Sequence, residues 1–272
     1  MEKGSEYGGG GGRRRQVESC VTNGWPGARL LCIMDLDILL EDGPLIAVNK
    51  PAGLLTQGVP HGHPALEAQI KQFLKQKYSK PGNVYLGVPH RLDRPVSGIV
   101  VFARNSKAAA RLAEQFRERT VRKIYLAVTE TVPGQPTGRL TDWLLKDAEA
   151  AHVTVVAPGT EGAREAILDY RVLATAAGRA LVEVQLHTGR MHQIRVQLAS
   201  RGWHIVGDLQ YGATLEPEQA ATYDRLSSPI ALHAYQLSLA HPVRYDPLEL
   251  QAPLPKNWDR FGTLVEGLAV AR

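Results

Sequence analysis

Four segments of the chain have the hydrophobic pattern of strands: residues 44–49, 98–103, 121–129 and 180–187. The first two are short apolar runs, and the third is rich in β-branched and aromatic side chains, which favour extended structure. In the last segment apolar and polar positions alternate, which predicts that Val182, Val184 and Leu186 face inward. Lys50-Pro51-Ala52-Gly53 follows the first run and is typical of a turn that ends a strand.

Three further segments repeat their apolar residues with the period of a helix: residues 64–77, 106–119 and 191–200. The second is expected to be capped at its start by the hydroxyl of Ser106. In the third, the apolar positions facing the core are Met191, Ile194 and Leu198. His192 and Arg195 lie three residues apart and share a different face of this helix.

The order of these elements predicts an α+β fold. Few helices separate the strands and several connections are short like hairpins, which argues against a doubly wound parallel sheet. A chain of 272 residues is long enough for one large domain or two small ones. Residues 1–25 are interpreted as a disordered tail because they contain the glycine run Gly8–Gly12, which leaves a globular domain over residues 26–272.

Composition excludes several classes of protein. Hydrophobic residues make up 44% of the chain and charged residues 22%, while the net charge of +5 weakly favours a polyanionic partner. Cys20 and Cys32 are too few for a disulfide framework or a zinc site built on cysteine pairs, and they favour a reducing compartment. No apolar run reaches the roughly 20 residues of a membrane span, and residues 1–15 lack the apolar core of a secretory signal, so a cytoplasmic location is expected.

The segment with the clearest chemistry is His90-Arg91-Leu92-Asp93-Arg94-Pro95-Val96-Ser97-Gly98, directly before the apolar run of residues 99–102. A carboxylate between cations at the mouth of a strand should have a lowered pKa and be ionised at neutral pH. Asp93 could then act as a nucleophile or a base. Taken alone, however, the segment is more typical of an aspartate that caps a turn and pairs with arginine, because structural ion pairs also perturb pKa values.

A second segment, Thr188-Gly189-Arg190-Met191-His192-Gln193-Ile194-Arg195, is followed by Gly202-Trp203-His204-Ile205-Val206-Gly207-Asp208 and by Tyr211-Gly212. Together with the first segment, these motifs resemble the signature of the RluA-type pseudouridine synthases. Shorter blocks match the same family in the same order: Asn49-Lys50-Pro51-Ala52-Gly53, Lys123-Ile124-Tyr125-Leu126, Leu232-His233-Ala234 and His241-Pro242. The resemblance runs from about Leu39 to about Trp258. Within the first motif only Val96 departs from the family, which usually has Thr there, and we expect this to have little effect on activity.

The resemblance implies a mixed, mainly antiparallel sheet with flanking helices and a central active-site cleft. It also implies an activity, the isomerisation of uridine in RNA, in which the bond from ribose C1′ to uracil N1 breaks and C1′ is joined to C5. This reaction needs no cofactor and no metal, and the sequence contains no glycine-rich phosphate loop or dinucleotide fingerprint. We therefore expect a stand-alone catalytic domain, with ribosomal or transfer RNA as its partner and nothing that demands more than a monomer.

Three residues match the catalytic positions of the family: Asp93, Tyr125 and Arg195. Asp93 would attack C1′ or deprotonate a sugar intermediate, and the sequence does not choose between these routes. It must keep its charge while buried against RNA, so it needs a cation, and Arg195 matches the family arginine that pairs with it. Tyr125 matches the tyrosine that stacks on the target base, and Leu232 matches an apolar position under the uracil.

A stacked uridine must be extruded from its RNA before it can react. His90 and Arg91 are candidates for filling the gap or holding the displaced backbone, and Arg190 and His192 for contacting phosphate. Each of these side chains is equally compatible with a purely structural role. A further candidate phosphate strip consists of Arg117, Arg119, Arg122 and Lys123.

Two other functions fit parts of the sequence. An RNA-binding protein without catalysis would be favoured by the loss of Asp93, Tyr125 or Arg195, but all three are present. A hydrolase that cleaves a glycosidic bond usually needs a second carboxylate, and Asp208, in a Gly-Asp turn, is interpreted as structural. His61 and His63 have no third ligand nearby and predict a loop, so no metal site is expected.

Overall fold

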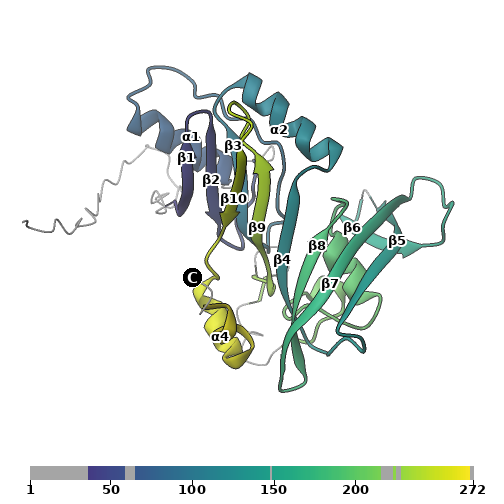
Figure 1. The fold of residues 1–272 in the computed structure, drawn as a ribbon. Helices are drawn as coiled ribbons and strands as arrows, with labels where there is room; N and C mark the ends of the chain where they lie inside the picture. The colour runs from purple at the N-terminus through teal and green to yellow at the C-terminus, as the bar shows by residue number, and fades with distance from the viewer. Residues whose placement is uncertain (1–35, 59–64, 148, 216–222, 225–227, 270–272) are drawn as a thin grey trace, which may run out of the picture. The chain divides into compact units, whose positions relative to one another are not determined.

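The computed structural model describes residues 36–58, 65–147, 149–215, 223–224 and 228–269 (Figure 1). These residues belong to one compact unit that begins at Leu36. The expected tail of residues 1–25, both cysteines and the pair His61 and His63 lie outside the described residues. Within the described part of the chain, no helix is long and apolar enough to cross a membrane.

The strands of the described residues form a single sheet in the order β1-β2-β3-β9-β4-β8-β7-β5-β6, with β10 paired to β9 (Figure 1). They are β1 (Ile38–Asp42), β2 (Leu45–Lys50), β3 (Ser97–Ala103), β4 (Arg122–Thr129), β5 (Thr137–Asp147), β6 (His152–Val156), β7 (Arg164–Ala176), β8 (Arg179–Leu186), β9 (Leu232–Ala240) and β10 (Pro247–Gln251). Every pair is antiparallel except β3 with β9. The expected α+β class with a mixed, mainly antiparallel sheet is confirmed.

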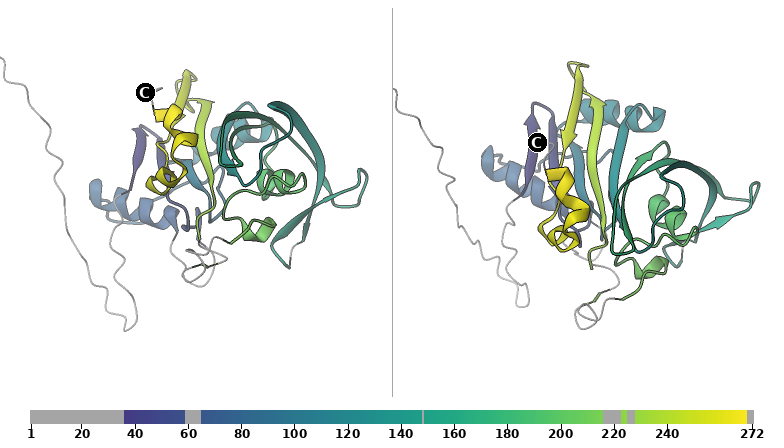
Figure 2. Two further views of the ribbon diagram at one scale, coloured as in Figure 1. Left: turned by 90° about the horizontal axis from the view of Figure 1, so that it is seen from below. Right: turned by 60° about the horizontal axis from the view of Figure 1, so that its bottom comes forward.

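The helices lie against this sheet as α1 (Leu66–Lys77), α2 (Ser106–Glu118), α3 (Gln193–Ala199) and α4 (Thr263–Ala269), with 3-10 turns η1 (Leu209–Tyr211) and η3 (Lys256–Phe261). The predicted cap of α2 was wrong by one residue, because the side chain of Asn105 accepts the hydrogen bond from the Ala108 N–H at 2.8 Å. Helix α3 begins two residues later than predicted, because His192 adopts a left-handed conformation with φ of 51°. The strands β5 to β8 curl around α3 (Figure 2).

The strands nearest the Asp93 motif are buried on both faces. In β2, Leu45 and Ala47 pack into one hydrophobic cluster with α2, while Ile46 and Val48 pack into a second cluster with α1. All residues of β3 are buried in the same way. Both segments are therefore continuous apolar runs in the sequence, since a strand covered on both sides has no solvent face that polar residues could occupy.

The contact of β3 with β9 depends on Gly98. This residue has a φ of +116°, and a Cβ atom placed on it would lie 2.3 Å from the carbonyl oxygen of Ala234. The parallel pairing comprises only Ser97 with His233 and Gly98 with Ala234. The close approach places the loop that carries Asp93 beside Leu232, the first residue of β9. Glycine is thus required here because φ is positive and because there is no room for a Cβ atom.

We predict that Gly98→Ala destabilises the protein strongly. The added methyl group must push β9 away from β3 and occupy a strained backbone conformation, so the free energy of unfolding should fall by about 3 kcal/mol or more. Urea denaturation measures this change. The matched control is Gly82→Ala, where a Cβ would meet nothing within 4 Å. Equal stability of the two variants would contradict the assigned role of Gly98.

Candidate active site

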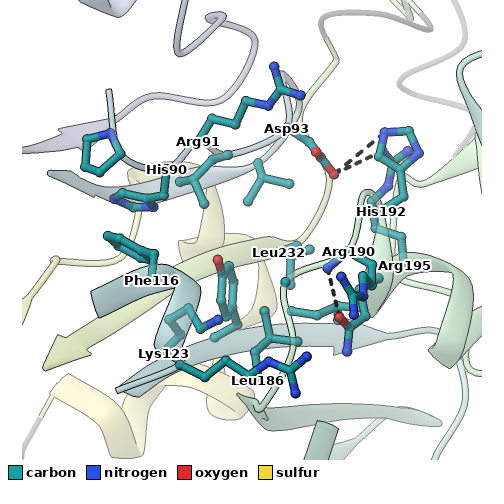
Figure 3. A pocket seen from close by; sticks show the side chains of 18 of the residues that line it. His90, Arg91, Asp93, Phe116, Lys123, Leu186, Arg190, His192, Arg195 and Leu232 are labelled. Atoms are coloured by element: carbon teal, nitrogen blue, oxygen red, sulfur yellow. Dashed lines mark hydrogen bonds and ion pairs between the residues drawn. The ribbon is translucent and has the colours of Figure 1, made fainter. Parts of the chain in front are cut away.

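A cavity of about 490 Å³ lies between the Asp93 loop, β4 and the start of α3 (Figure 3). Every site residue that the sequence predicted lines this cavity: Asp93, Tyr125, Arg195, His90, Arg91, Arg190, His192 and Leu232. They come from four separate parts of the chain, namely the loop before β3, β4, the segment leading into α3, and β9. The fold therefore brings together the motifs that are separated in the sequence.

The loop that carries Asp93 is held in place by hydrogen bonds from Lys50. The ammonium group of this fully buried lysine donates hydrogen bonds to the carbonyl oxygens of Pro51 (3.0 Å), Leu54 (2.8 Å) and Arg94 (3.2 Å). Burial lowers the pKa of Lys50 to about 7, although the nearby Asp93 carboxylate opposes this shift. Lys50 thus ties the turn after β2 to the residue that follows Asp93.

Four further hydrogen bonds fix the same loop. The hydroxyl of Thr56 donates to the carbonyl oxygen of Leu92 at 3.0 Å and accepts from the Leu92 N–H at 3.1 Å. Arg94 donates from Nε to the carbonyl oxygen of Gly53 at 2.9 Å. The N–H of Val96, which is buried, donates to the carbonyl oxygen of Asp93 at 3.1 Å. The backbone on both sides of Asp93 is therefore fixed before any substrate binds.

Arg195 lies beside Asp93 but is held mainly by another acid. Its Nη1 atom is 3.5 Å from Oδ2 of Asp93, whereas Nε and Nη2 each lie 2.7 Å from the two oxygens of Asp208. Nη2 also donates to the side-chain oxygen of Gln210 at 2.9 Å. Burial pulls the pKa of Arg195 down, but the hydrogen bonds and charge of Asp208 outweigh it and the pKa is raised.

Two neighbouring side chains contact the carboxylate of Asp93 at one of its oxygens. Arg195 and Nε2 of His192, at 3.8 Å, both approach the same oxygen, Oδ2 (Figure 3). Among the described residues, none makes a hydrogen bond with Oδ1. The Asp93 side chain is 30% exposed and lines the cavity, so the carboxylate is accessible to a molecule there. The site thus combines an oriented carboxylate with an open face.

Apolar side chains surround this carboxylate. Tyr125, on β4, is half-buried, and burial together with the Asp93 charge raises the pKa of its phenol. A β-bulge in the pairing of β4 with β9 falls between Ile124 and Tyr125, a feature that redirects side chains near functional sites. Leu232 is buried, and the lining also contains the apolar residues Pro89, Leu92, Val96, Phe116, Leu186 and Ile194. The walls can therefore accept a flat, largely apolar group such as a base.

His90 and Arg91 differ in their surroundings. Nε2 of His90 accepts a hydrogen bond from the Val101 N–H at 3.0 Å, and its ring stacks on Phe116 at 4.4 Å. Burial, assisted by Lys123, lowers the pKa of His90 to about 3, so this ring is neutral at physiological pH. His90 therefore holds β3 and α2 together. Arg91 is exposed and has no hydrogen bond or ion pair with any described residue.

One wall of the cavity is cationic, formed by Arg119, Lys123 and Arg190. Burial lowers the pKa of Lys123 and of Arg190, and the charge of Arg119 lowers both further. No described carboxylate lies within ion-pair distance of these three side chains. In the predicted phosphate strip, by contrast, Arg117 pairs with Glu114, and Arg122 donates to Gln185 and does not line the cavity.

The sequence did not identify several residues that organise the site: Lys50, Thr56, Asp208 and Tyr211. Lys50, Asp208 and Tyr211 stand in blocks that match the family, and that match is the signal that could have identified them. Asp208 was interpreted as a turn residue, yet it is 2% exposed and binds Arg195 through both oxygens. Among the described residues, no group of three or more His, Cys, Asp or Glu side chains could hold a metal ion.

The chain matches a known family over more than half of its length. The family model described as RNA pseudouridylate synthase matches residues 44–200. The ribosomal large subunit pseudouridine synthase D of Xylella fastidiosa is 34% identical over 233 residues, which cover 82% of this chain and 67% of that protein. The tRNA pseudouridine synthase C of Haemophilus influenzae is 34% identical over 238 residues, covering 83% of this chain and 96% of that protein.

A solved structure agrees with these relatives. Human RNA pseudouridylate synthase domain containing 4 superposes with a TM-score of 0.66 at 29% identity, covering 81% of this chain and 89% of that chain. The matched region contains the Asp93 loop, Tyr125 and Arg195. The chain therefore belongs to the RNA pseudouridylate synthase family, as an RluA-type member, and it is an isomerase that acts on RNA.

Proposed function

We propose that this enzyme converts uridine to pseudouridine in ribosomal or transfer RNA, with Asp93 as the group that reacts at the sugar of an extruded nucleotide. The observation that carries this proposal is the position of the Asp93 carboxylate. Its Oδ2 faces Arg195 and His192, and its side chain, which is 30% exposed, lines a cavity with apolar and cationic walls. This is the arrangement that an ionised carboxylate needs in order to reach a substrate atom.

The reaction is a rearrangement in which no atoms are gained or lost from the RNA. The bond from C1′ to N1 breaks, the uracil turns, a bond from C1′ to C5 forms, and C5 loses its proton while N1 gains one. Asp93 either attacks C1′ directly or removes a proton from the sugar, and both routes need a free carboxylate oxygen. The released base stays in the cavity, so it is recaptured by the same sugar.

Arg195 faces Asp93 with a charge that Asp208 already balances. A cation beside a buried carboxylate offsets the cost of desolvating it. The guanidinium provides that charge, while its two short bonds to Asp208 hold it in place. Asp93 therefore interacts with an oriented ion pair at 3.5 Å and keeps its reactivity.

Tyr125 provides the surface for the uracil ring. Stacking of a base on an aromatic ring contributes about 1–3 kcal/mol and accepts any base. Burial and the Asp93 charge raise the pKa of Tyr125, so the phenol stays protonated and does not repel the carboxylate. Leu232 lies buried in the same lining and completes the apolar contact.

The cationic wall accounts for the binding of RNA. Arg119, Lys123 and Arg190 have no carboxylate partner among the described residues, and the wall that they form suits a phosphate group next to the extruded uridine. Arg91 is exposed on the lining of the cavity and is available to the displaced backbone. The named activities of the two relatives on ribosomal and transfer RNA support these RNA classes as substrates.

Hydrolysis of a glycosidic bond is a poorer match to this site. That chemistry uses two carboxyl groups, one of which transfers a proton to or from water or the leaving group. Asp208 shares Arg195 with Asp93, but it is 2% exposed and bound to Arg195 through both of its oxygens. It is therefore not free to transfer a proton.

We predict that Asp93→Asn abolishes isomerisation. The amide keeps the size of the side chain but cannot attack C1′ or accept a proton, so the rate should fall by at least about 10³-fold. The measurement is tritium release from ribosomal and transfer RNA labelled at uridine C5. The control Asp246→Asn changes an exposed acid at Arg244 and should retain the full rate. Normal release by Asp93→Asn would contradict the assigned role of Asp93.

We also predict that the triple variant Arg119→Ala, Lys123→Ala, Arg190→Ala weakens binding to all RNAs to a similar extent. Each phosphate contact that is lost should reduce the slope of log Kd against log salt concentration by about 0.7–0.9. Filter binding at several salt concentrations measures this slope. Lys107→Ala removes an exposed cation from the first turn of α2, at the far end from the cavity, and should leave the slope unchanged. An unchanged slope in the triple variant would mean that this wall does not contact phosphate.

A further inference from the structure

The imidazole of His192 occupies an unusual position at the start of α3. His192 is the residue that precedes the helix, and its backbone is left-handed with φ of 51° and ψ of 20°. Such a conformation is uncommon for residues other than glycine and is found mostly where the surrounding structure enforces it. Its side chain makes no capping hydrogen bond to the helix, and it points instead toward Asp93 (Figure 3).

The hydroxyl of Tyr211 determines which nitrogen of this ring carries the proton. The Val153 N–H donates to the Tyr211 oxygen at 3.1 Å, and the same oxygen lies 2.8 Å from Nδ1 of His192. If Nδ1 were the donor, the phenolic hydrogen would have no acceptor among the described residues. Burial raises the pKa of Tyr211 to about 12, so its hydroxyl keeps the hydrogen and donates it to Nδ1. The ring proton is therefore on Nε2.

That proton faces the reactive carboxylate. Nε2 of His192 lies 3.8 Å from Oδ2 of Asp93, the same oxygen that Arg195 approaches at 3.5 Å. The ring is neutral at physiological pH, because burial lowers the pKa of His192. Asp93 and Asp208 oppose this effect, while Arg195 and His152 reinforce it.

We infer that His192 is a positioning residue for Asp93, held by Tyr211 in the form that presents an uncharged Nε2–H donor to Oδ2. This inference rests on the function proposed above. Arg195 and His192 approach the same carboxylate oxygen, at 3.5 and 3.8 Å, and together they favour one rotation of the carboxylate. A neutral donor does this without placing a second positive charge on Asp93, which would make the carboxylate a weaker base and nucleophile.

The surroundings of His192 do not suit a phosphate contact, which is the role that the sequence indicated for it. A phosphate ligand should be exposed and cationic, whereas the His192 side chain is 11% exposed and both ring nitrogens have partners within the site. Arg190, two residues earlier, is half-buried in the cationic wall, where its Nε donates to the carbonyl oxygen of Glu165 at 2.9 Å and no described carboxylate pairs with it. The two side chains of the same motif therefore have separate tasks, one toward the RNA backbone and one toward Asp93.

The first test observes the ring directly by nitrogen NMR of the full chain, and it does not depend on activity. We expect the wild-type ring of His192 to be protonated on Nε2 and to titrate below its ordinary value of 6.5. Asp93→Asn should lower this pKa further, because the carboxylate favours the charged ring. Tyr211→Phe removes the hydroxyl that donates to Nδ1, so the ring proton should no longer be confined to Nε2. A ring protonated on Nδ1, or a pKa that does not respond to Asp93→Asn, would overturn the inference.

The second test measures tritium release in a single turnover with saturating RNA, with the Kd for RNA determined separately. His192→Leu should lower the rate by about 10-fold, because it removes the polar N–H that lies 3.8 Å from Oδ2, with little change in Kd. His192→Gln, which can place an amide donor near Oδ2, should restore part of the rate. The matched control His187→Leu removes a histidine that contacts Asp169 outside the cavity and should retain the full rate.

The pH profile separates positioning from a general effect on folding. In the wild type, the single-turnover rate should fall only below pH 6.5, where protonation of His192 adds a second cation beside Asp93. In Tyr211→Phe, Nδ1 is freed to accept a proton, so this acid limb should move to higher pH. A loss in His192→Leu confined to Kd and its salt dependence would instead identify a phosphate contact. If wild-type protein released no tritium while the NMR results held, the proposed function would fail and the histidine assignment would stand.

Discussion

The parallel pairing of β3 with β9 at Gly98 is the contact on which the site depends. It joins β1, β2 and β3 to the rest of the sheet through only two residue pairs. A buried hydrogen bond of 2.8 Å between Ser97 Oγ and Nδ1 of His233 reinforces it, and burial lowers the pKa of His233 to about 4, so no charge is buried there. Because Asp93 precedes this contact and Leu232 begins β9, the pairing of β3 with β9 places the carboxylate beside the apolar lining of the cavity.

Much of this arrangement could be predicted from the sequence because its motifs are short and stand at the ends of strands. Apolar runs located β2, β3, β4 and β8 to within one or two residues, and the family motifs identified the residues that line the cavity. The backbone conformation of His192 could not be predicted. It shortens α3 and turns the imidazole toward Asp93, and the helical pattern of residues 191–200 carries no signal for it.

The residues that support the site were harder to recognise because their partners are distant or are backbone atoms. Lys50 binds backbone carbonyl groups, which have no signature in a sequence. Thr56 makes hydrogen bonds to the backbone of Leu92, which lies 36 positions away. Asp208 lies in a Gly-Asp turn, and only its spatial position against Arg195 distinguishes it from an ordinary turn residue. These roles depend on burial and strand register, which are properties of the folded chain and are not visible in the sequence pattern.

Because Asp208 pairs with Arg195, the free energy needed to bury and orient the guanidinium is spent during folding, before RNA binds. The guanidinium is desolvated and oriented as the chain folds, since both partners are almost fully buried without RNA. In the proposed reaction, little reorganisation of dipoles is then needed when charge shifts on the ribose, which is the condition under which fixed polar groups stabilise a transition state best. The free energy gained from binding RNA would then be left available for the proposed unstacking of the uridine.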